Sequence, residues 1–126
     1  MGSRSAIELL QLPVQLHGIR LGRPVDVLLD ADEWRALGFV VLCGDESLRF
    51  LVFAAADVEA DAIRVQSALM LLEDVEFYRA RSRSLRELLK PGEVRDLLLA
   101  RDGSVDALLL PDGSSVEVDE VSPARG

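Results

Sequence analysis

The sequence predicts a mainly β fold: a small barrel of short antiparallel strands, with one short helix and a C-terminal β-meander. Three observations lead to this prediction. Glycine and proline divide the chain into short apolar runs, the runs recur every 8–12 residues or so, and none is long enough for a helical bundle. The chain has 126 residues, of which 49% are hydrophobic and 29% charged. This size and balance fit one globular domain, or one domain with a partial second unit.

The first half of the chain contains five predicted strands. Each is an apolar run rich in Val, Leu, Ile or Phe and bounded by Gly, Asp or Ala-Asp turns. They cover residues 12–16, 25–29, 35–42, 47–54 and 62–65. Residues 67–78 stay ambiguous, because an apolar run as short as 68–72 fits a buried strand and a helical turn equally well.

A short helix is predicted at residues 84–90. Ser84 and Glu87 have the spacing of a capping box, in which the serine accepts a hydrogen bond from the third helical amide. Leu85, Leu88 and Leu89 would share one face, and Pro91-Gly92 ends the helix.

Three further strands, at residues 94–100, 105–110 and 115–121, form the predicted meander. Two Asp-Gly turns separate them, at Asp102-Gly103 and Asp112-Gly113. Asp-Gly supplies the positive φ that a tight hairpin requires.

The two halves of the sequence echo each other. Gly22 and Gly92 are each followed four positions later by an aspartate, Asp26 or Asp96, and then by an apolar triplet. With one gap, Ala36-Leu37 aligns with Ala107-Leu108. A duplication and a coincidence of common residues both explain the match. We expect the two aspartates to bind a turn amide or an arginine rather than to catalyse a reaction.

Four segments of the first half carry a family resemblance. They are Val25-Asp26-Val27-Leu28-Leu29-Asp30 after Gly22, Ala36-Leu37-Gly38-Phe39-Val40-Val41, Phe50-Leu51-Val52-Phe53 with Ala56-Asp57-Val58, and Asp61-Ala62-Ile63-Arg64-Val65. This pattern resembles the PRC-barrel family, found in the photosynthetic reaction-centre H subunit and in the C-terminal domain of the ribosome-maturation factor. The resemblance covers about half of the chain. It departs from the family at Arg23-Pro24 and at Ala54-Ala55-Ala56.

The resemblance implies a compact barrel that acts as an adaptor, in a family without a shared catalytic residue. We therefore expect a PRC-barrel-like domain at residues 6–76. Residues 77–122 would form a partial second repeat, packed on the first domain or pairing in a dimer, and residues 123–126 a frayed tail.

Charge and composition argue against several classes of function. The net charge of −8 disfavours nucleic acid and anionic lipid as partners. One histidine, His17, and one cysteine, Cys43, allow neither a histidine dyad nor an internal disulfide, and we expect Cys43 to be buried and inert. The acidic group Asp30, Asp32 and Glu33 fits a solvated turn better than a cation site. We expect no catalytic, cofactor or metal site and a cytoplasmic location.

Two features are candidate partner-binding sites. Arg79, Arg81, Arg83 and Arg86 form the one basic concentration, and in an extended segment the first three would share a face. They could bind an acidic partner or a phosphate backbone, or neutralise acidic residues of the same chain. Trp34 could be an exposed docking anchor or a plug at the end of the barrel.

These observations predict a non-enzymatic adaptor or assembly module that binds a protein partner. A homodimer formed through open strand edges is one form of this hypothesis. The alternative is a module associated with RNA or the ribosome, which would use the basic segment Arg79–Arg86.

Overall fold

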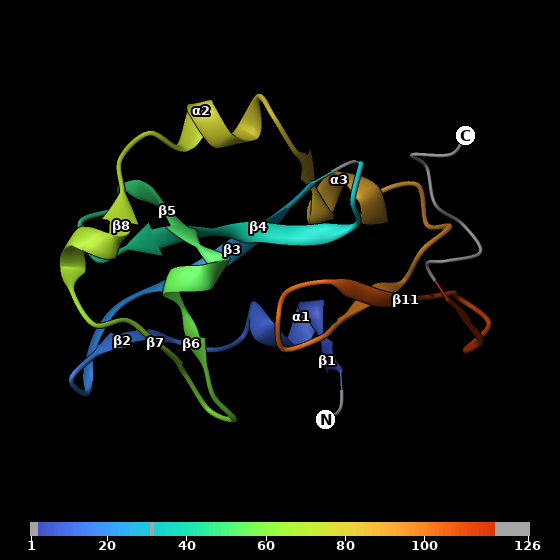
Figure 1. Ribbon diagram of the computed structural model, residues 1–126, viewed down its shortest axis with the longest axis horizontal. Helices are drawn as coiled ribbons and strands as arrows, with labels where there is room; N and C mark the ends of the chain where they lie inside the picture. Colours follow the sequence, from blue (N-terminus) through green and yellow to red (C-terminus); the bar gives the residue numbers. More distant parts are fainter. Residues whose placement is uncertain (1–2, 31, 118–126) are drawn as a thin grey trace.

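A computed structural model describes residues 3–30 and 32–117 and confirms the mainly β fold (Figure 1). The strands of the first half are β1 (Arg4–Ser5), β2 (Val14–Leu16), β3 (Ile19–Asp30), β4 (Arg35–Cys43), β5 (Leu48–Val52), β6 (Asp57–Val58), β7 (Ile63–Arg64) and β8 (Leu71–Leu72). The strands of the second half are β9 (Arg83–Ser84), β10 (Asp96–Leu99), β11 (Val105–Leu109) and β12 (Ser115–Glu117). The helical elements are α1 (Ala6–Leu9), η1 (Phe53–Ala55), η2 (Ala68–Met70), α2 (Val75–Arg79) and α3 (Leu85–Leu89).

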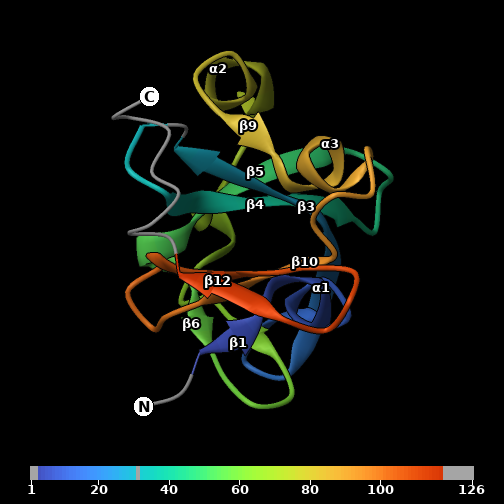
Figure 2. The same ribbon diagram turned by 90° about the vertical axis from the view of Figure 1, so that its right-hand side faces the viewer.

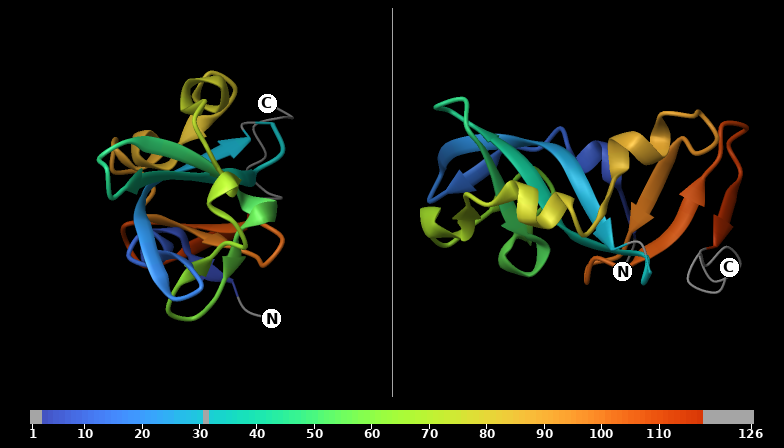
Figure 3. Two further views of the ribbon diagram at one scale, coloured as in Figure 1. Left: turned by 90° about the vertical axis from the view of Figure 1, so that its left-hand side faces the viewer. Right: turned by 90° about the horizontal axis from the view of Figure 1, so that it is seen from above.

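The strands form two sheets. The first has the order β6-β7-β2-β3-β4-β5-β8, with β9 also paired to β3, and the second has the order β1-β10-β11-β12. Figure 2 shows β3, β4 and β5 of the first sheet above β10 and β12 of the second, with α2 and α3 above these first-sheet strands and α1 and β1 below β10. The second sheet lies at one end of the long axis, and β2, β5 and β8 lie at the other (Figures 1 and 3).

The described strands form open sheets rather than the closed barrel that was predicted. The first sheet ends at β6 and at β8, each of which is two residues long and pairs with one neighbour. One apolar core lies between the sheets, with Phe39 and Leu51 from the first and Leu97 and Leu108 from the second. Among the described residues the two sheets share a core, and a single isolated bridge between Arg35 and Ser104 connects them in place of a ladder that would close a barrel.

The hairpin β3–β4 is the centre of the first sheet. Strand β3 alternates buried and more exposed residues from Gly22 to Asp26 and is then buried from Val27 to Leu29. Gly38 of β4 is required by packing, since a Cβ there would lie 2.2 Å from the carbonyl oxygen of Leu51 on β5. Strands β3, β4 and β5 can thus pack closely beneath α2 and α3.

The hairpin β10–β11 of the second sheet repeats the pairing register of β3–β4. Leu28 pairs with Gly38 and Leu98 pairs with Ala107, and a bulge follows immediately in both hairpins. This register corrects the alignment predicted from the sequence, because it matches Ala107 to Gly38 rather than to Ala36. The meander and the helix at residues 84–90 are confirmed, with α3 spanning Leu85–Leu89.

The two halves exchange their N-terminal segments. In the first sheet Leu28 pairs with Ser84 of β9, which comes from the second half of the chain. In the second sheet Leu98 pairs with Ser5 of β1, which comes from the first half. Each serine then begins a short helix, α3 or α1. The predicted boundary between residues 76 and 77 therefore separates strands that pair with each other.

The ambiguous segment 67–78 contains both predicted structures. Residues 68–70 form η2, Leu71–Leu72 form β8, and α2 begins after Asp74, whose carboxylate accepts a hydrogen bond from the amide of Phe77 at 3.2 Å. The end of the last predicted strand, 118–121, and the predicted frayed tail, 123–126, lie outside the described residues. No helix in the described part of the chain is long and apolar enough to cross a bilayer.

Candidate functional site

Asp26 joins the first sheet to the helix that the second half contributes. Its side chain is buried, with its residue 5% exposed. One carboxylate oxygen accepts hydrogen bonds from the amides of Val27 at 2.9 Å and Arg86 at 3.2 Å, and the other accepts from the hydroxyl of Ser84. The Ser84 oxygen in turn accepts from the amide of Glu87 at 3.4 Å. The carboxylate therefore holds β9 and the first turn of α3 against β3.

Asp96 repeats this arrangement in the second sheet. It is 7% exposed and accepts from the amides of Leu97 at 2.7 Å and Ile7 at 3.1 Å, and from the hydroxyl of Ser5. The Ser5 oxygen accepts from Glu8 at 3.2 Å. Both aspartates thus bind amides, and one amide at each aspartate belongs to a helix from the opposite half of the chain: Arg86 of α3 at Asp26, and Ile7 of α1 at Asp96.

The tips of the two hairpins also meet with matched hydrogen bonds. The amide of Ala36 donates to the carbonyl of Gly103 at 2.7 Å, and the amide of Val105 donates to the carbonyl of Trp34 at 2.8 Å. Trp34 and Gly103, which correspond in the two hairpins, have φ values of 52° and 93°. The two hairpins are therefore related by an approximate two-fold axis at this contact. We call the contact between the hairpin tips the seam.

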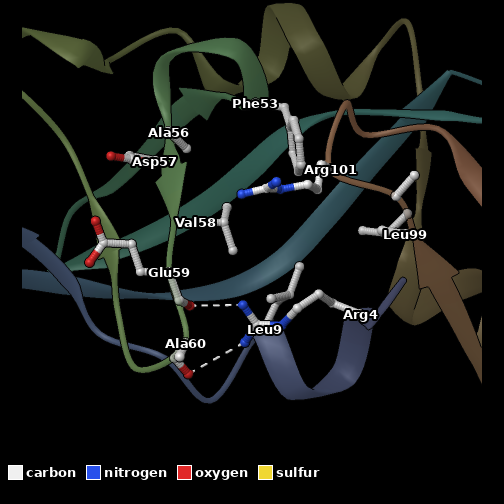
Figure 4. A pocket seen from close by; sticks show the side chains of 11 residues that line it. Arg4, Leu9, Phe53, Ala56, Asp57, Val58, Glu59, Ala60, Leu99 and Arg101 are labelled. Carbon is white, nitrogen blue, oxygen red and sulfur yellow. Dashed lines mark hydrogen bonds between the residues drawn. The ribbon is translucent and has the colours of Figure 1, made fainter. Parts of the chain in front are cut away.

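A cleft of about 940 Å³ opens beside this seam and is the candidate functional site (Figure 4). One wall comes from Phe53 and from residues 56–60 around β6. The opposite wall comes from Arg4 of β1, Leu9 of α1, and residues 99–101 at the end of β10. The volume lies in the range of pockets that enclose small ligands or short chain segments.

The charged groups directed into this cleft are two guanidinium groups. Arg4 donates to the carbonyl oxygens of Glu59 at 2.8 Å and Ala60 at 3.5 Å, which ties the two walls together. Arg101 extends into the cleft between Phe53 and Val58 (Figure 4).

Neither carboxylate of the β6 wall faces Arg101. The carboxylates of Asp57 and Glu59 point away from the cleft (Figure 4), and Glu59 accepts a hydrogen bond from Arg64 at 2.5 Å. That hydrogen bond raises the pKa of Arg64 above its ordinary value. The guanidinium of Arg101 is within 4.0 Å of no carboxylate of the described residues. The interior of the cleft is therefore locally positive.

The β6 wall of the cleft is an unpaired strand edge. Val58 lies opposite Ile63 of β7. The amide of Ile63 points away from β6 and donates to the carbonyl oxygen of Pro13 at 2.8 Å. Val58 and Ile63 therefore form a pair without mutual hydrogen bonds, so the N–H and C=O of Val58 point away from β7. This side of β6 faces the cleft (Figure 4).

Phe53 connects the cleft to the seam. Its ring stacks on Phe39 in the core, with centroids 5.7 Å apart. A Cβ on Gly103 would lie 3.0 Å from this ring, so the tip of the second hairpin packs directly against it. The shape of the cleft therefore depends on the contact between the two halves.

The structure separates the four candidate arginines: the extended segment in which three of them would share a face is not formed, because Arg79 lies in a helix. Asp74 caps a helix, so Arg79 lies on α2, where it pairs with Glu76 at 3.5 Å. Arg81 lies over the ring of Phe77 at 3.9 Å, and its guanidinium donates to the carbonyl of Phe77 at 2.9 Å.

The other two arginines of the set lie on β9 and α3. Arg83 is exposed on β9, opposite Leu29, and Arg86 donates from its Nε to the carbonyl of Val25. Contacts within the chain thus occupy three of the four side chains.

Trp34 is half-buried at the seam. Its ring packs against the shared core, and its Nε1 atom is buried without a hydrogen-bond partner among the described residues. Of its two predicted roles, this position resembles the plug more than the exposed anchor.

The remaining polar candidates have structural partners. The Asp30 carboxylate accepts from the amides of Asp32 at 2.8 Å and Glu33 at 3.0 Å, which closes the turn. Cys43 is half-buried, and burial raises the pKa of its thiol. His17 occupies a tight turn with a φ of 51°.

The cleft was not found from the sequence. Phe53 and Val58 belong to a segment of the family resemblance and Arg101 precedes an Asp-Gly turn, but no pattern linked the three residues, which the topology brings together. One signal for the seam was overlooked: Arg4-Ser5, Glu8 and Leu9-Leu10 repeat the spacing of Arg83-Ser84, Glu87 and Leu88-Leu89. Together with the repeated aspartates, this match pointed to a second capped helix.

Comparison with protein-family models and with curated proteins finds no match for this chain. The geometry of the cleft is therefore the basis for the functional proposal.

Proposed function

We propose that this protein is a non-enzymatic adaptor and that a segment of a protein partner binds in the cleft at the seam. The observation that carries the proposal is the cleft itself. It combines an unpaired strand edge, at Val58, with an apolar wall and an arginine, Arg101, that has no carboxylate partner among the described residues. Such features suit recognition of a protein chain.

The chemistry of the lining groups supports binding rather than catalysis. Arg4 and Arg101 are the ionisable side chains directed into the cleft (Figure 4). Arginine stays protonated at physiological pH, so neither can act as a general base or a nucleophile. Arg101 can hold an anionic group by charge-assisted hydrogen bonds, whereas Arg4 already donates to the carbonyls of Glu59 and Ala60. A single cysteine suits a reducing compartment, and we place the protein in the cytoplasm.

A role with RNA has less support. It depended on the basic segment Arg79–Arg86, and the structure places Arg79, Arg83 and Arg86 on three separate elements, α2, β9 and α3. The net charge of −8 also opposes a polyanionic partner.

Homodimerisation through the free edge of β12 stays part of the proposal. Strand β12 pairs with β11 on one side, and among the described residues no strand pairs with its other side. Light scattering after size-exclusion chromatography tests this proposal. A doubling of mass with concentration is expected, and a monomer over the whole concentration range would remove it.

Site-specific photo-crosslinking in the native host tests the adaptor function. A benzoylphenylalanine at Ala100 lies in the cleft, and the matched control at Asp112 lies in the turn at the other end of β11. We expect a discrete protein adduct from the Ala100 position that is lost when Arg101→Glu is added. Equal adducts at both positions, or no protein adduct in the cleft, would contradict the proposal, and adducts with RNA would favour the alternative.

A further inference from the structure

We infer that the partner segment binds as an additional β-strand along β6 and places one acidic side chain against Arg101. This inference rests on the proposed function, because it takes the cleft to be the binding site. It adds the conformation of the segment and the chemistry of its central residue.

The backbone of β6 dictates the conformation. Val58 directs both its N–H and its C=O into the cleft, where an extended segment can form one reciprocal pair of hydrogen bonds with it. Because β6 is two residues long, the segment needs only about three residues, or roughly 10 Å at the rise of a strand. The added strand would extend the first sheet beyond its present end.

The position of Arg101 dictates the chemistry of one side chain. Its guanidinium lies beside Val58, from the opposite wall of the cleft (Figure 4). A carboxylate on the segment, near the residue that pairs with Val58, can therefore accept from Arg101 in the bidentate geometry that guanidinium groups favour. Arg4 is already bound to the carbonyls of Glu59 and Ala60, so Arg101 is the group available.

The net charge of the chain limits how acidic the segment can be. At −8 the protein repels a run of acidic residues at long range. A single carboxylate among apolar residues avoids most of this repulsion and keeps the local contact with Arg101. Apolar neighbours also match the apolar surface that Phe53 and Val58 give to the cleft. The segment we expect is thus an apolar strand with one Glu or Asp.

An array of N-acetylated, C-amidated pentapeptides tests the side-chain contact. Their central residue is Glu, Gln or Lys, and their flanks vary among Ala, Val, Leu and Thr. The purified full-length chain should prefer Glu over Gln by about tenfold, the effect of one charge-assisted contact. Arg101→Gln should abolish the preference, and Arg101→Glu should shift it to Lys. A preference for Glu that persists in Arg101→Gln would overturn the inference.

A second pair of variants tests the strand pairing. Val58→Pro removes the N–H that points into the cleft and removes no hydrogen bond to β7, whereas Val58→Ala keeps the N–H. Peptide binding should fall at least tenfold in the proline variant and little in the alanine variant. Circular dichroism checks that both variants fold.

Peptides that are N-methylated at the central amide probe the other hydrogen bond of the reciprocal pair, in which the peptide N–H donates to the C=O of Val58. They leave the protein unaltered and should also lose binding. Equal binding of methylated and unmethylated peptides would exclude strand addition. Binding of free glutarate that matches the best pentapeptide would mean that the cleft takes a small carboxylate only. If crosslinks to a protein persist at Ala100 while neither Val58→Pro nor Val58→Ala changes peptide binding, strand addition is excluded and the adaptor function stands.

Discussion

At the scale of residues, two buried carboxylates connect the halves of this molecule. Asp26 and Asp96 each accept three kinds of hydrogen bond. The donors are a serine hydroxyl, an amide in the first turn of a helix, and the amide of the residue that follows the aspartate in the chain. A buried donor that loses its acceptor costs about 1–3 kcal/mol. These two residues therefore contribute more to stability than their number suggests.

Replacing either aspartate should destabilise the protein strongly. We expect Asp26→Ala and Asp96→Ala each to lower the free energy of unfolding by about 2–4 kcal/mol, because several buried donors lose their acceptor together. Urea denaturation measures the change, and Asp32→Ala in the exposed turn is the control. Strong coupling between Asp26→Ala and Ser84→Ala in a double-mutant cycle is also expected, and additive effects would argue against the hydrogen bond.

The sequence identified these two aspartates and the kind of group that they bind. It did not identify the serines and amides that they contact, because Asp26 and Ser84, like Asp96 and Ser5, are far apart in the chain. Local patterns carry no direct information about such pairs.

At the scale of elements, one turn motif recurs in three hairpins. In each, an aspartate oxygen accepts from the amide and the hydroxyl of the serine two positions later. The three aspartates are Asp45, Asp102 and Asp112. The residue between is Glu46, Gly103 or Gly113, with a positive φ of 69°, 93° or 92°. Only the first of these turns places a side chain in the left-handed region.

Exchanging the central residue should therefore have opposite effects in two of these turns. Glu46→Gly relieves the left-handed strain and should stabilise the protein by roughly 0.5–1 kcal/mol. Gly113→Ala introduces the same strain where no atom crowds the new Cβ, and it should destabilise by a similar amount. Thermal unfolding measures both, and a loss of stability in Glu46→Gly would contradict the interpretation.

The same turns predict acid sensitivity. Hydrogen bonds from Ser47, Ser104 and Ser114 lower the pKa values of the three aspartates. Since the folded pKa lies below the unfolded one, the stabilisation is fully present above the ordinary pKa of about 4. It is lost as the pH falls through the folded values. Replacing all three aspartates by asparagine should flatten the decline of the urea midpoint below about pH 4, and an unchanged decline would contradict this.

Most strands could be predicted from the sequence, because Gly, Pro and Asp-Gly turns bound their apolar runs. Helix α3 was predicted from the spacing of Ser84 and Glu87. Helix α1 was missed although Ser5 and Glu8 have the same spacing. The sequence left residues 67–78 ambiguous between strand and helix, so it did not reveal the helix that begins after Asp74 and places Arg79 on α2.

At the scale of the whole molecule, the exchange of helices between the halves creates the cleft. Arg4 and Leu9 reach the cleft because β1 and α1 dock on the second sheet, and Arg101 reaches it from the end of β10. Phe53 and Val58 complete it from the first sheet. Periodicity predicts a strand but not its partner, so neither the pairing of β1 with β10 nor the cleft could be deduced from the sequence.

Native-state hydrogen exchange tests this interlocked arrangement most directly. If the halves are one cooperative unit, amides of β4 in the first sheet and of β11 in the second should open with the same free energy. Asp96→Ala should lower both values equally, although Asp96 lies in the second sheet. Loss of protection confined to the second sheet in Asp96→Ala, with the first sheet unchanged, would contradict the account.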